Sequence, residues 1–158
     1  MLGLYFDEIE TGLAVELGSD HFTRETVLRF ARKFDPQPFH VDDAAAAIGP
    51  FGKLAASGWH TAAGWMKCYV ATNDAARARL TAEGKVVPEG GPSPGFTNLK
   101  WLKPVYPGDT LTYRCKVTGK RVLASRPKWG IVSSMNEGRN QHGELVFSNE
   151  GKVLVARR

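Results

Sequence analysis

The spacing of apolar residues predicts an amphipathic helix over FTRETVLRFARKF (22–34). Its apolar positions recur every three or four residues, as one helix face requires, and they are Val27, Phe30, Ala31 and Phe34. Thr23 can cap the start, and Pro36 prevents continuation because a proline disfavours helical backbone in the residue before it. The helix should therefore present Asp35 at its C-terminal edge.

A second, longer helix is predicted from Trp59 to Leu80, directly after Ser57-Gly58. The segment WHTAAGWMKCYVATNDAARARL is apolar on most faces, which predicts that the helix is buried. Gly64 inside it would let another part of the protein pack closely against the backbone.

Later in the chain the hydrophobic period changes to two. VVPEGGPSPG (86–95) is a loop by composition, and YPGD (106–109) has the proline and glycine of a type II turn. Apolar and polar residues then alternate over 111–118. Two further strands are predicted over 129–135 and 145–156, separated by the polar turn NEGRNQHGE. Early helices and late strands indicate an α+β class with a largely antiparallel sheet.

Length and composition narrow the class of protein. The 158 residues, 42% of them hydrophobic, suffice for a single domain over residues 1–158. The net charge of +5 comes from scattered basic residues without a basic stripe, so no nucleic-acid partner is expected. Cys68 and Cys115 are too few for a disulfide scaffold or a structural zinc site. The N-terminus resembles neither a signal peptide nor a membrane span, so we expect a cytoplasmic protein without a membrane partner.

The segment FDPQPFH (34–40) holds the first candidate chemistry. A carboxyl group with a pKa of about 4 and an imidazole with one of about 6.5 can share proton transfer at neutral pH. Pro36 and Pro38 each fix φ, so we predict a stiff elbow that turns Asp35 and His40 toward one water. The alternative is that Asp35 ends a helix, His40 caps the next one, and the prolines only mark a turn.

The segment GPFGKLAASGWHT (49–61) supplies a candidate oxyanion hole. The Gly58 N–H would lie among the unpaired amides at the start of the predicted helix, where partial positive charge collects. Such a donor can stabilise negative charge that develops on a carbonyl oxygen, and a glycine lets a substrate approach the backbone closely. Ser57 can act as the N-cap at the same time.

Three segments of the chain together carry a family resemblance, namely DPQPFHVD (35–42), FGKLAASGWHT (51–61) and LKPVYPGDTL (102–111). In order and spacing they resemble the MaoC-like dehydratases, which include the R-specific enoyl-CoA hydratases. The first motif is the specific one, and the last is typical of the fold. The resemblance implies a hot-dog fold, in which a curved antiparallel sheet wraps a long hydrophobic helix, and a homodimer or dimer-based oligomer. Gln37 stands where the family usually has asparagine, and Ser57 where histidine is also common.

The resemblance also implies an activity and a site. Such enzymes add water across the double bond of a trans-2-enoyl thioester, or reverse this, on an acyl-CoA substrate and without a separate cofactor. Asp35 would position and activate the water, His40 would be its acid/base partner, and the Gly58 N–H would hold the thioester oxygen. The side chains expected to contact the substrate are Gln37, Phe39, Ser57 and Trp59.

Two other functions stay open. A hot-dog thioesterase would direct water at the thioester carbonyl, but its acid generally lies on the central helix, and residues 59–71 contain none. The second alternative function is a non-catalytic module that binds acyl thioesters. Ser57 lacks the flanking glycines of a nucleophile elbow, and His60, in the first helical turn, is expected to be structural.

Three further expectations concern the surroundings of the site. The four histidines are dispersed, so no metal is predicted. The loop 86–95 is a candidate lid or pocket wall. The basic residues that could meet coenzyme A phosphates are Lys100, Lys103, Arg114, Arg121, Arg126 and Lys128.

Overall fold

The computed structural model describes all residues from Met1 to Arg158. Its helices are the short 3-10 helix η1 (Phe6–Glu8), α1 (Arg24–Phe34), α2 (Pro38–Val41), α3 (Asp43–Ala47) and α4 (Gly58–Ala82). Its strands are β1 (Ala14–His21), β2 (Gly95–Trp101), β3 (Thr110–Val122), β4 (Trp129–Arg139) and β5 (Leu145–Ala156). No helix is long and apolar enough to cross a membrane.

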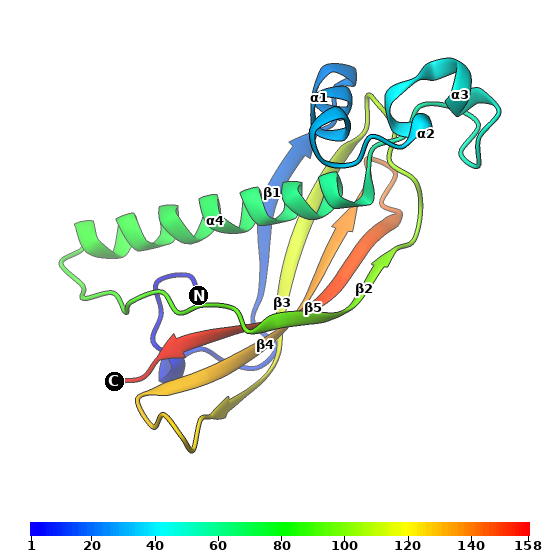
Figure 1. Cartoon of the computed structure of the whole chain (residues 1–158). Helices are drawn as coiled ribbons and strands as arrows, with labels where there is room; N and C mark the ends of the chain where they lie inside the picture. The colour runs from blue at the N-terminus through cyan, green and yellow to red at the C-terminus, as the bar shows by residue number, and fades with distance from the viewer.

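The five strands form one antiparallel sheet in the order β1-β3-β4-β5-β2. Figure 1 shows α4 lying across the curved sheet, with α1, α2 and α3 gathered at the end where α4 begins. The predicted α+β class with an antiparallel sheet is therefore confirmed.

Most predicted elements are present, with shifted ends. The strand 145–156 has the predicted bounds, and the predicted type II turn is present, with Gly108 at φ 98° and Asp109 N donating to Tyr106 O at 3.0 Å. The turn predicted over 136–144 begins too early, because β4 continues to Arg139. Asn136 can lie buried within this strand because its side-chain amide donates to Asn149 Oδ1 at 2.8 Å, so a polar residue occupies an interior position.

The prediction that helices precede strands is wrong for β1, which precedes α1. β1 is an edge strand in which Leu17 is the buried residue, and β2, at the other edge, has no buried residue. Strands with so little burial lack the alternation on which a sequence prediction depends.

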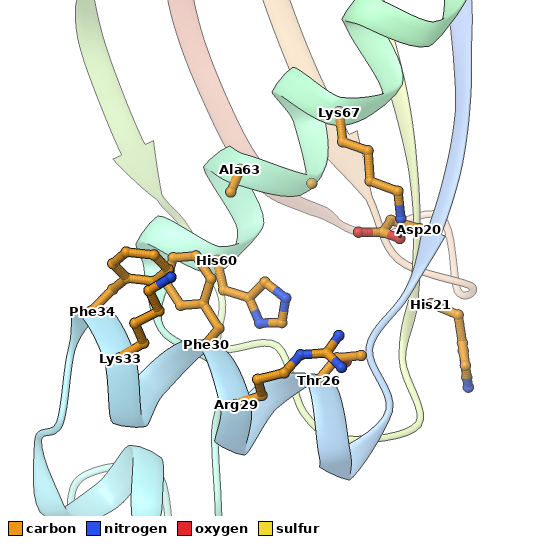
Figure 2. A pocket seen from close by; sticks show the side chains of 11 residues that line it. Asp20, His21, Thr26, Arg29, Phe30, Lys33, Phe34, His60, Ala63 and Lys67 are labelled. Carbon is orange, nitrogen blue, oxygen red and sulfur yellow. Dashed lines mark hydrogen bonds and ion pairs between the residues drawn. The ribbon is translucent and has the colours of Figure 1, made fainter.

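α1 begins and ends as predicted. The Thr23 side chain accepts a hydrogen bond from Thr26 N, and Asp35 is the C-cap. Val27 and Ala31 are fully buried, whereas Phe34, the last residue of the predicted stripe, is 62% exposed. α1 packs on α4 through a stack of Phe30 on His60, whose ring centroids are 4.6 Å apart (Figure 2).

The prediction that the long helix is buried is wrong for the single chain. α4 buries Thr61, Gly64 and Cys68, while Met66 and Val70 are about half exposed at 45% and 47%. Figure 1 shows the helix on one face of the sheet, and apart from α1 at its first turns no other helix or strand covers its opposite side. The predicted close approach at Gly64 is confirmed, because a Cβ there would lie 2.8 Å from the Tyr113 hydroxyl.

Candidate active site

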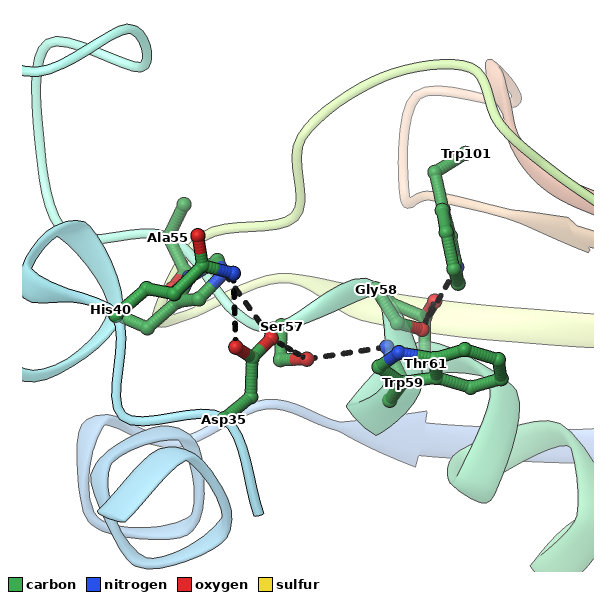
Figure 3. Close-up of polar contacts among 9 residues, drawn as sticks. Asp35, His40, Ala55, Ser57, Gly58, Trp59, Thr61 and Trp101 are labelled. Carbon is green, nitrogen blue, oxygen red and sulfur yellow. Dashed lines mark hydrogen bonds and ion pairs between the residues drawn. The ribbon is translucent and has the colours of Figure 1, made fainter.

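Three segments that are distant in sequence meet at the first turn of α4 (Figure 3). Asp35 follows the end of α1, His40 lies on the single turn of α2, and Ser57 precedes Gly58 at the start of α4. The strand-like segment before α4 is fixed by backbone hydrogen bonds, in which Ala56 N donates to Val105 O at 2.7 Å. The site is therefore assembled by packing of α1 and α2 against the beginning of α4.

The Asp35 carboxylate contacts both titratable and neutral partners. Its Oδ2 lies 3.5 Å from His40 Nε2 and accepts a hydrogen bond from Ser57 Oγ at 2.6 Å. Its Oδ1 accepts one from Gln37 Nε2 at 2.9 Å. The elbow predicted around Pro36 and Pro38 thus brings the acid and the imidazole together.

His40 is held in one orientation by the backbone. Its Nδ1 lies 2.7 Å from Ala55 O, and its side chain is 6% exposed. A carbonyl oxygen only accepts, so Nδ1 carries a proton and donates it to this bond. Nε2 is then the nitrogen that faces Asp35 and that can gain or lose a proton.

The environment favours an ionised Asp35. Burial alone would raise its pKa, because the side chain is only 16% exposed. Hydrogen bonds from Ser57 and Gln37, with the positive charge that His40 can carry, outweigh burial, so the pKa of Asp35 lies below its ordinary value. The site therefore pairs a carboxylate that accepts hydrogen bonds with an imidazole that can exchange protons.

The start of α4 offers a free backbone donor. Ser57 is the N-cap, as predicted, and its Oγ accepts a hydrogen bond from Trp59 N at 3.1 Å. The Gly58 N–H makes no hydrogen bond within the chain. It therefore remains available, at the positive end of the helix dipole, for an oxygen of a bound molecule.

A cavity of about 480 Å³ joins these groups. Six of the seven residues predicted for the site line it, namely Asp35, Gln37, Phe39, His40, Gly58 and Trp59. Ser57 is the exception, because it is fully buried and its hydroxyl is bonded to Asp35. Its contact with a substrate stays a prediction, whereas its contact with the acid is a feature that the sequence did not predict.

With one exception, the other candidate residues lie outside this cavity. Among the basic residues proposed for phosphates, Lys103 lines the cavity, where it pairs with Glu144. None of residues 86–95 lines it, so the lid suggested for that loop does not cover this cavity. His60 faces a separate cavity of about 380 Å³ between α1 and α4, which is consistent with the packing role expected for it (Figure 2).

Comparison with known proteins identifies the family of this chain. Residues 9–135 match the MaoC like domain. The chain is 30% identical over 151 residues to the uncharacterised protein YdeM of Bacillus subtilis, covering 96% of this chain and 98% of that protein. The chain belongs to the MaoC-like dehydratase family.

Solved structures with the MaoC-like fold superpose closely on the chain. The MaoC-like dehydratase from Rhodospirillum rubrum has a TM-score of 0.81 and 34% identity, with 98% of each chain covered. The R-hydratase PhaJ1 from Pseudomonas aeruginosa has a TM-score of 0.67 and 22% identity, with 98% of this chain and 86% of that chain covered. The predicted hot-dog fold is therefore confirmed.

Sequence reasoning missed several residues of this MaoC-like cavity. Phe51 and Trp101, at its wall, lie in the motifs or beside them, and Trp101 contacts both Gly58 and Trp59. Trp101 ends β2, an edge strand without a periodic pattern, 43 positions after Gly58. No local signal connects such positions, since only the fold brings the end of β2 to the start of α4.

Proposed function

We propose that this protein catalyses the reversible hydration of a trans-2-enoyl thioester, with coenzyme A as the thiol part of the substrate. The observation that carries the proposal is the contact of His40 Nε2 with Asp35 Oδ2 at 3.5 Å, in the wall of a cavity that Gly58 also lines. Membership of the MaoC-like family, which includes such hydratases, supports the same reaction. Asp35, His40 and Gly58 are the proposed catalytic groups.

In the direction of hydration, Asp35 and His40 hold one water against C3 of the enoyl group. The lowered pKa of Asp35 keeps it ionised, so that it accepts a hydrogen bond from one O–H of this water without taking its proton. Nε2 of His40, unprotonated because Nδ1 carries the proton, takes the other hydrogen as the oxygen bonds to C3.

The electrons of the C2=C3 bond then move toward the thioester, whose oxygen gains negative charge. The free Gly58 N–H donates to this oxygen, where the helix dipole adds to its effect. His40 returns the proton from Nε2 to C2, so one water is added in total and both side chains recover their starting states. Elimination follows the same steps in reverse.

The substrate contacts proposed for Phe39 and Trp59 rest on their place in the cavity wall. Gln37 supports the acid through its hydrogen bond to Oδ1, so a longer amide than the family's usual asparagine still reaches Asp35.

The decisive experiment follows the loss of enoyl-thioester absorbance with crotonyl-CoA and with longer, branched and dicarboxylic enoyl-CoAs. We expect hydration by the native protein and a loss of about 10²–10⁴-fold in kcat for Asp35→Asn and for His40→Ala. Asp74→Asn and His142→Ala, both exposed and outside the cavity, serve as matched controls and should keep full activity.

Two outcomes contradict the proposal. Release of free thiol without loss of the double bond would assign the protein to the thioesterases. Binding of acyl-CoA without any turnover would make it the non-catalytic module, with Asp35 and His40 as parts of a stiff turn.

A further inference from the structure

Trp101 makes three contacts at the start of α4 (Figure 3). Its indole Nε1–H donates to Gly58 O at 2.8 Å. Its ring meets Trp59 edge-on, with centroids 5.1 Å apart and an interplanar angle of 76°. Its indole also lies where a side chain of residue 58 would begin, because a Cβ there would be 2.5 Å from Trp101 Cε2.

This close approach gives a specific reason for glycine at position 58. Gly58 has an ordinary helical conformation and is not among the glycines with positive φ, so backbone strain does not require it. The space beside its Cα is filled by the indole of Trp101. A residue with a Cβ would fit at position 58 only if the indole moved. Glycine therefore admits an indole here, in addition to any approach by a substrate.

A glycine at the first helical position has little restraint of its own. The peptide group that follows Gly58 is fixed by two donors, since Gly58 O accepts from Thr61 Oγ1 at 2.6 Å and from Trp101 Nε1 at 2.8 Å. Thr61 belongs to the same helix, so Trp101 is the donor to Gly58 O that comes from the sheet. The free N–H of the cavity lies on the other side of the Gly58 Cα, in the Ser57–Gly58 peptide group, whose carbonyl oxygen accepts from His60 N at 2.9 Å. Trp101 therefore acts on this N–H across the Cα of Gly58.

We propose that Trp101 is a positioning residue that holds the Gly58 N–H in line with the thioester oxygen. This inference rests on the proposed hydratase function and adds to it a residue on β2 that no motif of the sequence contains. Trp101 acts through Gly58 and takes no part in proton transfer. Its effect therefore falls on the step in which the oxygen gains charge rather than on substrate binding.

The first test is Trp101→Phe, which keeps an aromatic wall and removes the N–H donor. We expect kcat for the best enoyl-CoA to fall about 2- to 10-fold, as the loss of one hydrogen bond implies. KM should change less than about threefold, because the lost interaction matters in the transition state. Trp129→Phe, at the start of β4 and outside the cavity, is the matched control. A rise in KM with an unchanged kcat would make Trp101 a pocket wall only.

The second test asks whether Trp101 acts through Gly58. Gly58→Ala keeps the backbone N–H but displaces the indole, so it should lose activity by the same route as Trp101→Ala. We expect the activity of the double variant to lie within about threefold of that of the less active single variant, because the effects of coupled sites do not multiply. Losses that multiply would mean that the two residues act independently, which contradicts the proposal.

A measurement without turnover separates this inference from the proposed function. In ¹⁵N–¹H NMR spectra, the Gly58 amide resonance should shift in Trp101→Phe and stay in place in Trp129→Phe. If the native protein hydrates no enoyl thioester while this shift occurs, the hydratase function is wrong and the hold of Trp101 on Gly58 stands. If the protein is active and neither the amide nor kcat responds, Trp101 has no positioning role.

Discussion

The ionisation of Asp35 depends on two neighbours rather than on contact with water. Its side chain is mostly buried, yet Ser57 donates to Oδ2 and Gln37 donates to Oδ1. Hydrogen bonds of this kind stabilise the charged form, which is why the pKa lies below its ordinary value despite burial. Ser57 therefore caps α4 and also donates a hydrogen bond to the proposed acid.

Removing this donor should change the pH dependence of the reaction. In Ser57→Ala the pKa of Asp35 rises, so the acid limb of kcat/KM against pH, where this carboxylate becomes protonated, moves to higher pH. The lost cap also lowers the free energy of unfolding by about 1 kcal/mol. Rates measured across pH with the best enoyl-CoA, and urea unfolding, test both effects.

Ser133→Ala, on β4 outside the cavity, is the control for this variant. An acid limb that coincides with that of the native protein would show that Ser57 only caps the helix. The contact itself could not be predicted from sequence, because Ser57 and Asp35 are 22 positions apart and both have local roles at helix ends. The motif located the residues, whereas only the fold shows which of them touch.

Among the elements, those with a clear period and a buried face could be predicted. α1 and β5 have both, and their ends agree with the pattern. β1 and β2 lie at the edges of the sheet with almost no buried residues, so their sequences resemble loops. α4 carries apolar residues on most of its faces, so its sequence does not show which face packs on the sheet.

Gly64 sets how closely α4 approaches the sheet. The Tyr113 hydroxyl donates to Thr61 O at 2.9 Å and would lie 2.8 Å from a Cβ at position 64. Gly64→Ala should therefore destabilise the protein by about 1–3 kcal/mol, the usual cost of overpacking, although alanine is the better helix former. Chemical denaturation of the native and variant proteins measures this change.

A variant of Tyr113 provides the control for this prediction. Tyr113→Phe removes the oxygen that obstructs the new methyl group, so Gly64→Ala should cost less in that background than in the native one. An increase in stability from Gly64→Ala alone would show that helix propensity dominates and that α4 can shift.

At the scale of the whole molecule, the two edges of the sheet differ in character. The exposed residues of β1 are small or polar, whereas β2 and the residue after it expose Phe96, Trp101 and Leu102 by 53%, 45% and 47%. An exposed apolar edge strand is a surface on which another strand can pair. We therefore propose that the homodimer expected for this family forms through the β2 edge, beside the cavity that Trp101 lines.

A charge on this edge should separate the subunits. In an interface with twofold symmetry, Phe96→Glu would place two carboxylates close together and bury them without partners, so the Kd of the dimer should rise at least about tenfold. Sedimentation velocity over a range of concentrations measures this change.

Val122→Glu is the matched control, since Val122 is an apolar residue of similar exposure, 45%, on β3. If both variants stay dimeric, the subunits meet elsewhere, and the exposed face of α4 around Met66 and Val70 becomes the surface to test by the same substitution. If the native protein sediments as a monomer at every concentration, the proposed dimer is wrong.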